Sequence, residues 1–168
     1  MKTTHPKSEP KIVTVPNPVL KKPTRPVTKF DERLQKLIRK MKETLKAQRN
    51  PEGVGLAANQ IGIGLRVAIV RLNPEETNSS PNFLAIVNPK ITKHSRKTGS
   101  EHEGCLSVPR QYIPIERFET ITIEAQDLQG QTLKIKASGF LARIFQHEID
   151  HLNGRLITGR AMEKTRTE

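Results

Sequence analysis

The sequence predicts an α+β fold in which antiparallel sheets pack around a central helix with a metal-binding motif. Short β-branched and apolar runs indicate strands, and one stretch alternates apolar and polar residues around a glycine turn. The helix is indicated by FQHEIDHLNG (145–154), which contains the motif HExxH; Ser138 can cap this helix and Gly154 can end it. Histidines four residues apart in a helix lie about 40° apart on one face, so both imidazoles can bind one ion.

The length of 168 residues suits one domain with a modest core, which we expect to span residues 11–160. Residues 1–10 predict a flexible basic tail, and residues 161–168 a short C-terminal tail. Four prolines between positions 16 and 26 favour an extended segment. The short apolar runs, the lack of a signal-peptide pattern and the single cysteine predict a cytoplasmic protein with no membrane partner. We expect a monomer.

Three stretches predict the regular elements that precede the HExxH helix. Apolar residues recur at helical spacing from about Asp31 to Ala47, with Asp31 as the cap, which predicts an amphipathic helix on the outside of the domain. Residues 65–72 and 83–89 predict strands joined by a polar loop. Residues 120–137 predict a hairpin.

The chain is strongly basic, and the excess charge is concentrated near its start. The 29 Lys and Arg residues exceed the 17 Asp and Glu residues, and residues 1–46 contain 13 basic and 4 acidic residues. Such a surface attracts polyanions, although a solvated, solubilising surface explains the charge equally well. The basic face of the predicted N-terminal helix consists of Lys36, Arg39, Lys40, Lys42 and Lys46.

A catalytic metal site normally needs a third protein ligand besides the two histidines. The segment EHEGCLSVP (101–109) contains the only cysteine, Cys105, next to Gly104, which lets a metal or substrate approach the backbone. A cysteine sulfur with two imidazoles is a sound ligand set for a divalent metal, and ligand chemistry alone favours Zn²⁺. Alternatively, Cys105 is a small buried apolar residue.

Three motifs carry a resemblance to a known family. GVGLAANQIG (53–62), EGCLS (103–107) and QHEIDH (146–151), in this order and at these separations, resemble the signature motifs of peptide deformylases. The similarity extends over about residues 12–156. It implies metal-dependent hydrolysis that removes the N-formyl group from the initiator methionine of nascent polypeptides and releases formate.

The resemblance also implies roles for individual residues. It implies Cys105, His147 and His151 as ligands of one divalent metal ion, Fe²⁺ in the cell, with Zn²⁺, Ni²⁺ or Co²⁺ as alternatives. It implies Glu148 as the general acid/base. The implied oxyanion donors are the side chain of Gln60 and the backbone N–H of Leu106.

Further residues match family positions around the substrate. The side-chain pocket for methionine is implied for Val54, Gly104, Phe140 and Ile144, together with Leu106; core packing is the ordinary alternative for each. Gly55, in a stretch with Val54 and Gly53, can offer a strand edge to an extended peptide. We also expect Glu103 and Arg117 to form an ion pair behind Cys105.

Two departures from the family pattern affect the implied partners. Tyr112 stands where relatives often have arginine, which concerns contacts with substrate residues beyond methionine. Only 14 residues follow Gly154, so we expect no long basic C-terminal helix for docking on the ribosome. A weak electrostatic ribosome contact through the basic N-terminal quarter is the alternative that we expect.

Two other classes of protein share some of these features. A HExxH metalloprotease would need a third ligand downstream, for which Glu163 and Glu168 are the candidates. A non-catalytic RNA-binding module with a structural metal would explain the charge, but one Tyr and no Trp leave few aromatic side chains for base stacking. Release of formate from a formyl-methionyl peptide distinguishes all three classes.

Overall fold

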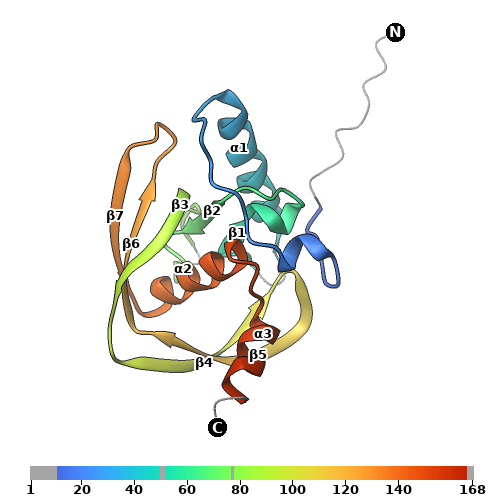
Figure 1. Ribbon diagram of the computed structural model, residues 1–168, viewed down its shortest axis with the longest axis vertical. Coiled ribbons are helices and arrows are strands. Elements are labelled where there is room, and N and C mark those ends of the chain that lie inside the picture. The colour runs from blue at the N-terminus through green and yellow to red at the C-terminus, as the bar shows by residue number, and fades with distance from the viewer. Residues whose placement is uncertain (1–10, 50–51, 77, 166–168) are drawn as a thin grey trace.

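The computed structural model describes residues 11–49, 52–76 and 78–165, and Figure 1 shows the arrangement of the elements. The strand pairs in these residues are antiparallel, as predicted, and form two sheets. The larger sheet has the order β1-β2-β3-β6-β7, with bounds Gly55–Ala57, Val67–Arg71, Phe83–His94, Thr120–Gln126 and Thr132–Ser138. The smaller sheet pairs β4 (Thr98–Cys105) with β5 (Val108–Phe118).

Helices accompany both sheets. The α-helices of the described residues are α1 (Glu32–Ala47), α2 (Gly139–Leu152) and α3 (Ile157–Thr165), and the short 3₁₀ helices are η1 (Pro18–Lys21) and η2 (Ala58–Ile61). Across the described part of the chain, no helix is both long and apolar enough to span a membrane.

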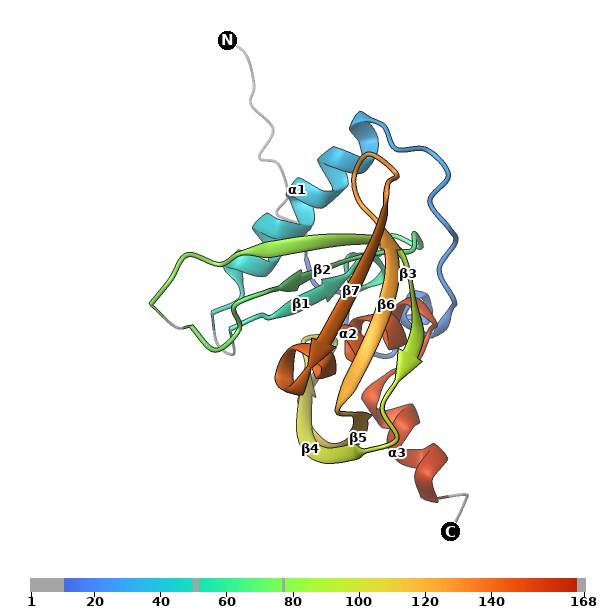
Figure 2. The ribbon, with the colours of Figure 1, turned by 90° about the vertical axis from the view of Figure 1, so that its left-hand side faces the viewer.

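Helix α1 confirms the predicted amphipathic helix. Its cap residue Asp31 accepts hydrogen bonds from the backbone N–H groups of Arg33 and Leu34, at 3.0 and 3.3 Å. Its apolar side chains pack with Val67 and Ile69 of β2; they are Leu34, Leu37, Ile38, Met41 and Leu45. Figure 2 shows α1 on the outer side of the larger sheet, so its basic residues face away from the core.

Helix α2 covers the opposite face of this sheet. Phe145 and Leu152 pack with Ala68 and Val70 of β2, the strand residues that alternate with those facing α1. The helix also contacts β5 of the smaller sheet, and it lies in the middle of the view in Figure 1. The side chain of Ser138 makes no capping hydrogen bond, contrary to our expectation. Burial of the apolar side chains of α2 against the sheet contributes to its position.

The main difference from the predicted elements lies between Lys90 and Phe118. Strand β3 continues to His94 instead of ending near Pro89, and β4 and β5 form a long hairpin that we did not predict. Strand β4 reads TGSEHEGC, with two glycines and mostly polar residues. It therefore lacks the apolar alternation from which a strand is normally predicted.

The C-terminal part differs from the prediction in one respect. Gly154 follows α2 with φ of 74°, which confirms its predicted position, and a Cβ there would lie 2.8 Å from backbone atoms of Lys21. Beyond this turn, α3 reaches Thr165, so residues 161–165 are helical where we expected a short tail. The predicted tail of residues 1–10 lies outside the described residues.

Candidate metal centre

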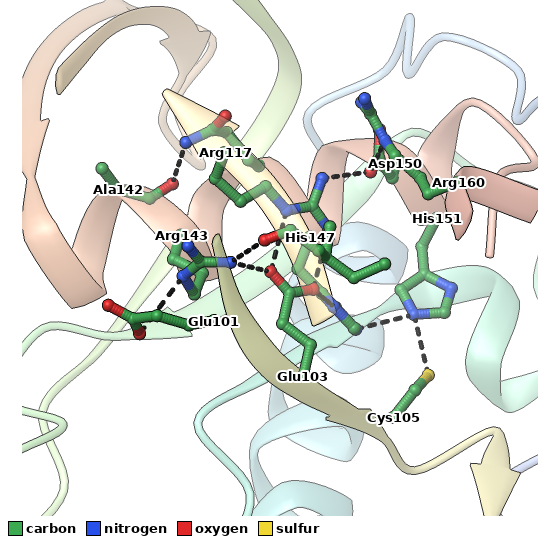
Figure 3. A network of polar contacts seen from close by, with 12 residues as sticks. Glu101, Glu103, Cys105, Arg117, Ala142, Arg143, His147, Asp150, His151 and Arg160 are labelled. Carbon is green, nitrogen blue, oxygen red and sulfur yellow. Dashed lines mark hydrogen bonds and ion pairs between the residues drawn. The ribbon is translucent and has the colours of Figure 1, made fainter. Parts of the chain in front are cut away.

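Helix α2 and the end of β4 bring three potential metal ligands together. The Nε2 atoms of His147 and His151 lie 3.1 Å apart, and the Cys105 sulfur lies 3.2 Å from His151 Nε2. One donor atom from each of these residues lies within 4.8 Å of the others. Figure 3 shows the imidazole of His151 between the sulfur and the second histidine. The structure thus places the three predicted ligands around one point.

The donor geometry fits a single divalent ion. Ligand atoms bound tetrahedrally at about 2.0–2.3 Å from a metal lie about 3.3–3.6 Å apart. The two separations from His151 Nε2, 3.1 and 3.2 Å, are close to this range. The Nδ1–H of His147 donates to Glu103 Oε2 at 3.0 Å, which leaves the Nε2 lone pair free to face the other donors. Burial lowers the pKa of His151 well below its ordinary value, so this imidazole is neutral, as a ligand must be.

The surroundings of His147 favour a positive charge at this point. Burial alone would lower the pKa of His147, but hydrogen bonds with Cys105 and Glu103 raise it well above the ordinary value. A cation beside the sulfur is therefore stabilised here. A bound metal ion would supply this charge in place of a proton.

Glu103 is the centre of the hydrogen bonds behind the ligands. It accepts two bonds from Arg117, both at 2.8 Å, which confirms the predicted ion pair. It also accepts one bond from Arg143 Nη1 at 2.8 Å, in addition to the bond from His147. Burial alone would raise the pKa of Glu103, but these donors hold it well below its ordinary value. Glu103 therefore remains a carboxylate and fixes the orientation of the His147 ring.

Arg143 is a site residue that our sequence analysis missed. It precedes His147 by four residues, so both side chains lie on the same face of α2. Its guanidinium is buried and also donates to the carbonyl groups of Ile115 and Gly99, at 2.8 and 2.9 Å. The helical spacing to His147 is the signal from which this residue could have been found.

Glu148 lies next to His147 and has an unusual environment. The residue is 3% exposed, and its Oε2 atom has no hydrogen-bond partner among the described residues. Burial raises the pKa of Glu148 to about 7. A Cβ at Gly55 would lie 2.4 Å from Glu148 Oε1, so glycine at this position leaves room for the carboxylate. Gly55 thus shapes the site in addition to its predicted place beside the substrate.

The two predicted oxyanion donors lie on neighbouring segments. Gln60, in η2, accepts a hydrogen bond from the backbone N–H of Ala57 at 2.9 Å, which fixes the direction of its amide. Its Nε2 donates to Ser107 Oγ at 3.2 Å and lies 3.9 Å from the Cys105 sulfur. Leu106 lies in the turn between β4 and β5. Both residues therefore border the metal centre.

A cleft of about 740 Å³ opens beside these residues. The predicted site residues along its wall are Val54, Gly55, Gln60, Gly104, Cys105, Leu106, Phe140, Ile144, His147 and Glu148. His151 is buried and is not part of this wall. Tyr112 also lines the cleft; it is 64% exposed, and its ring lies close to Gly104. The structure thus gathers every predicted site residue at one cleft or directly behind it.

The alternative ligands for a metalloprotease fall outside the side chains that the structure describes. Glu168 lies outside the described residues, and Glu163 belongs to α3, of which only the backbone is described at that position. Among the described residues, the set that can hold a metal comprises Cys105, His147 and His151. A sulfur and two imidazoles beside a buried carboxylate, at the wall of an open cleft, define the class of metallo-hydrolases.

Comparisons with known proteins agree with this class. Residues 10–167 match the family model described as polypeptide deformylase. A peptide deformylase of Dictyoglomus turgidum is 44% identical over 149 residues, which cover 89% of this chain and 90% of the relative. The chain belongs to the polypeptide deformylase family.

Solved structures show the same relationship. The crystal structure of peptide deformylase from Thermotoga maritima superposes with a TM-score of 0.78 at 41% identity, covering 89% of this chain and 95% of that chain. The structure of a peptide deformylase from Synechococcus elongatus in complex with actinonin gives a TM-score of 0.81 at 33% identity, over 96% and 83% of the two chains. The antiparallel sheets described above are therefore those of a peptide deformylase fold.

Proposed function

We propose that this chain hydrolyses the N-formyl group of the initiator methionine of nascent polypeptides and releases formate. The observation that carries the proposal is the buried carboxylate of Glu148 beside the three grouped donors, at a cleft large enough for a peptide end. The family relationship supports the same substrate class.

In this proposal, Cys105, His147 and His151 hold one divalent ion, and α2 is the central metal-binding helix of the fold. A bound ion would act as a Lewis acid that makes a water molecule easier to deprotonate. We propose Fe²⁺ as the ion in the cell, on the basis of the family resemblance, with Zn²⁺, Ni²⁺ and Co²⁺ as alternatives. The mixed sulfur and nitrogen donors suit all four metals.

Glu148 moves the proton during the reaction. Its carboxylate, on the cleft wall, accepts the proton of the attacking water and later passes it to the departing amine nitrogen. The oxygen of the water joins the formyl carbon, the C–N bond breaks, and the products are formate and a free α-amine. The carbonyl oxygen gains negative charge on the way, and the Gln60 side chain and the Leu106 N–H donate to it.

The cleft positions the peptide end for this step. Strand β1 is an edge strand of the larger sheet, so the backbone near Gly55 can pair with an extended peptide. Val54, Gly104, Phe140 and Ile144 line the same cleft and form the pocket for the methionine side chain. Backbone pairing places few demands on the side chains that follow, which suits substrates of varied sequence.

The proposed function predicts metal-dependent formate release. Protein purified without oxygen should contain about one divalent ion per chain and hydrolyse formyl-Met-Ala-Ser, while the acetylated peptide, as control, stays intact. Removal of the ion with a chelator should abolish the reaction, and Fe²⁺ should restore it. Cleavage of an internal peptide bond without formate would instead identify a metalloprotease. Bound metal without either reaction would identify a binding module.

We further propose a cytoplasmic monomer that contacts ribosomal RNA weakly through α1. Arg39 and Lys40 are exposed and Lys42 is partly exposed, whereas the apolar face of the helix is buried. These side chains are free to approach phosphates without disturbing the core. Lys36 is engaged with Glu32 at 3.2 Å, so it is less suited to this contact.

Charge reversal on α1 tests this contact. Arg39→Glu, Lys40→Glu and Lys42→Glu together should reduce co-sedimentation with ribosomes, and the remaining binding should depend less steeply on salt. A matched control reverses the exposed charges of Lys93, Lys134 and Lys136, on β3 and β7. This control variant changes the net charge by the same amount as the α1 variant and should bind ribosomes like the unmodified protein. Equal binding of both variants would contradict a contact through α1. Hydrolysis of formyl-Met-Ala-Ser should be nearly unchanged in both variants.

A further inference from the structure

The buried ion pairs behind the metal centre continue far beyond Glu103. Arg117 donates from Nε and Nη2 to Glu103, and its third nitrogen, Nη1, donates to Asp150. Figure 3 shows this guanidinium between the two carboxylates. Both acids and Arg117 are buried, with 7%, 6% and 3% exposure for Glu103, Asp150 and Arg117 respectively. One guanidinium is thus shared between two buried negative charges.

Arg160 of α3 provides the second positive charge that Asp150 needs. Its Nε lies 2.7 Å from Asp150 Oδ2, and its Nη2 lies 2.6 Å from Oδ1, so both carboxylate oxygens are bound. This planar two-point contact is the strong form of an arginine–carboxylate pair. Without it, Asp150 would be a buried charge neutralised by Arg117 alone. Arg117 would then be drawn toward Asp150 and away from Glu103.

Packing of α3 fixes the position of Arg160. Leu156, Ile157 and Ala161 belong to a hydrophobic cluster with Val108 and Ile115 of β5. The helix contacts both strands of the smaller sheet, and Figures 1 and 2 show it beside β5. Arg160 is therefore part of a docked helix, although its side chain remains 34% exposed at the outer end of the ion-pair chain.

We propose that Arg160 is a positioning residue for the metal ligand His147, acting through Asp150, Arg117 and Glu103. Because Arg160 neutralises Asp150, two nitrogens of Arg117 remain bound to Glu103. Glu103 in turn accepts the Nδ1–H of His147 and orients its ring. Helix α3 thereby becomes part of the metal centre without touching the metal or the substrate. This inference rests on the proposed metal site.

The test is the Zn²⁺ affinity of Arg160→Gln, measured by competition between the Zn²⁺-loaded protein and a chelator. We expect the dissociation constant to rise about tenfold, the low end of the usual effect of losing a group that orients a ligand. Arg155→Gln is the matched control, because Arg155 is exposed and lies five residues away in the same segment. It removes the same charge and should leave the affinity unchanged. Circular dichroism verifies that both variants are folded under the conditions of the measurement.

A double-mutant cycle tests the route of the effect. Glu103→Gln should itself weaken Zn²⁺ binding, and Arg160→Gln added to it should have less than about a twofold further effect, because the intermediate link is already lost. Unchanged Zn²⁺ affinity in Arg160→Gln would overturn the inference. It would also be overturned if Arg160→Gln weakened Zn²⁺ binding equally in the unmodified protein and in the Glu103→Gln variant. If the unmodified protein bound no Zn²⁺, the metal site of the proposed function would fail instead.

Discussion

Replacing Glu148 by alanine is expected to lower turnover of formyl-Met-Ala-Ser by about 10²- to 10⁴-fold while the protein keeps its metal. The reason is that the other buried carboxylate beside the grouped donors, Glu103, is already engaged. Glu103 is nearest to the ligands, but its oxygens accept bonds from Arg117, Arg143 and His147. Among the described carboxylates, only Glu148 combines a place on the cleft wall with a buried oxygen that lacks a hydrogen-bond partner.

Glu148→Gln is the control for shape, because it keeps the size of the side chain beside Gly55 but cannot accept the proton. It should be about as slow as the alanine variant. The measurements are kcat from released formate and metal content per chain. If metal content and rate fell together in both variants, Glu148 would have a structural role and the proposed acid/base role would be wrong.

The elements with clear hydrophobic periodicity could be predicted from the sequence, whereas the smaller sheet could not. The buried positions of α1 and the alternation from Ile121 to Ala137 follow from their sequence patterns, because one face of each element is buried. Strand β4 has polar side chains because it borders the cleft and the ion pairs, and Glu103 is its one buried residue. Its strand conformation depends on pairing with β5, and such long-range pairing leaves no local signal.

In the site, too, residues close in the sequence could be predicted to lie together, whereas contacts between distant segments could not. The spacing of His147 and His151 places two donors on one helical face, and the motifs added Cys105, which the structure brings to them. Arg160 and Asp150 could not be connected to the ligands in this way. Their link to His147 passes through Arg117 on a different strand, and no spacing in the sequence indicates which buried charges meet.

Alanine in place of Cys105, His147 or His151 is expected to abolish stoichiometric metal binding and, with it, formate release. Two remaining ligands do not hold a divalent ion with useful affinity, since catalytic sites of this type rely on three. Metal content after extensive dialysis and the rate of formate release are the measurements. His94→Ala is the matched control, because His94 is an exposed histidine that stacks on Phe118 and lies outside the ligand set.

Among the three variants, Cys105→Ala gives the clearest result. Loss of His147 would also remove a hydrogen-bond partner of Glu103, and loss of His151 would leave a cavity in the buried end of α2, so either change disturbs more than one donor. The Cys105 side chain is small, and its removal should leave the bond between His147 and Glu103 in place. Loss of metal in Cys105→Ala therefore reports the loss of the sulfur itself. Full metal occupancy in this variant would show that the two histidines bind the ion with another partner, and the assignment of Cys105 as third ligand would be wrong.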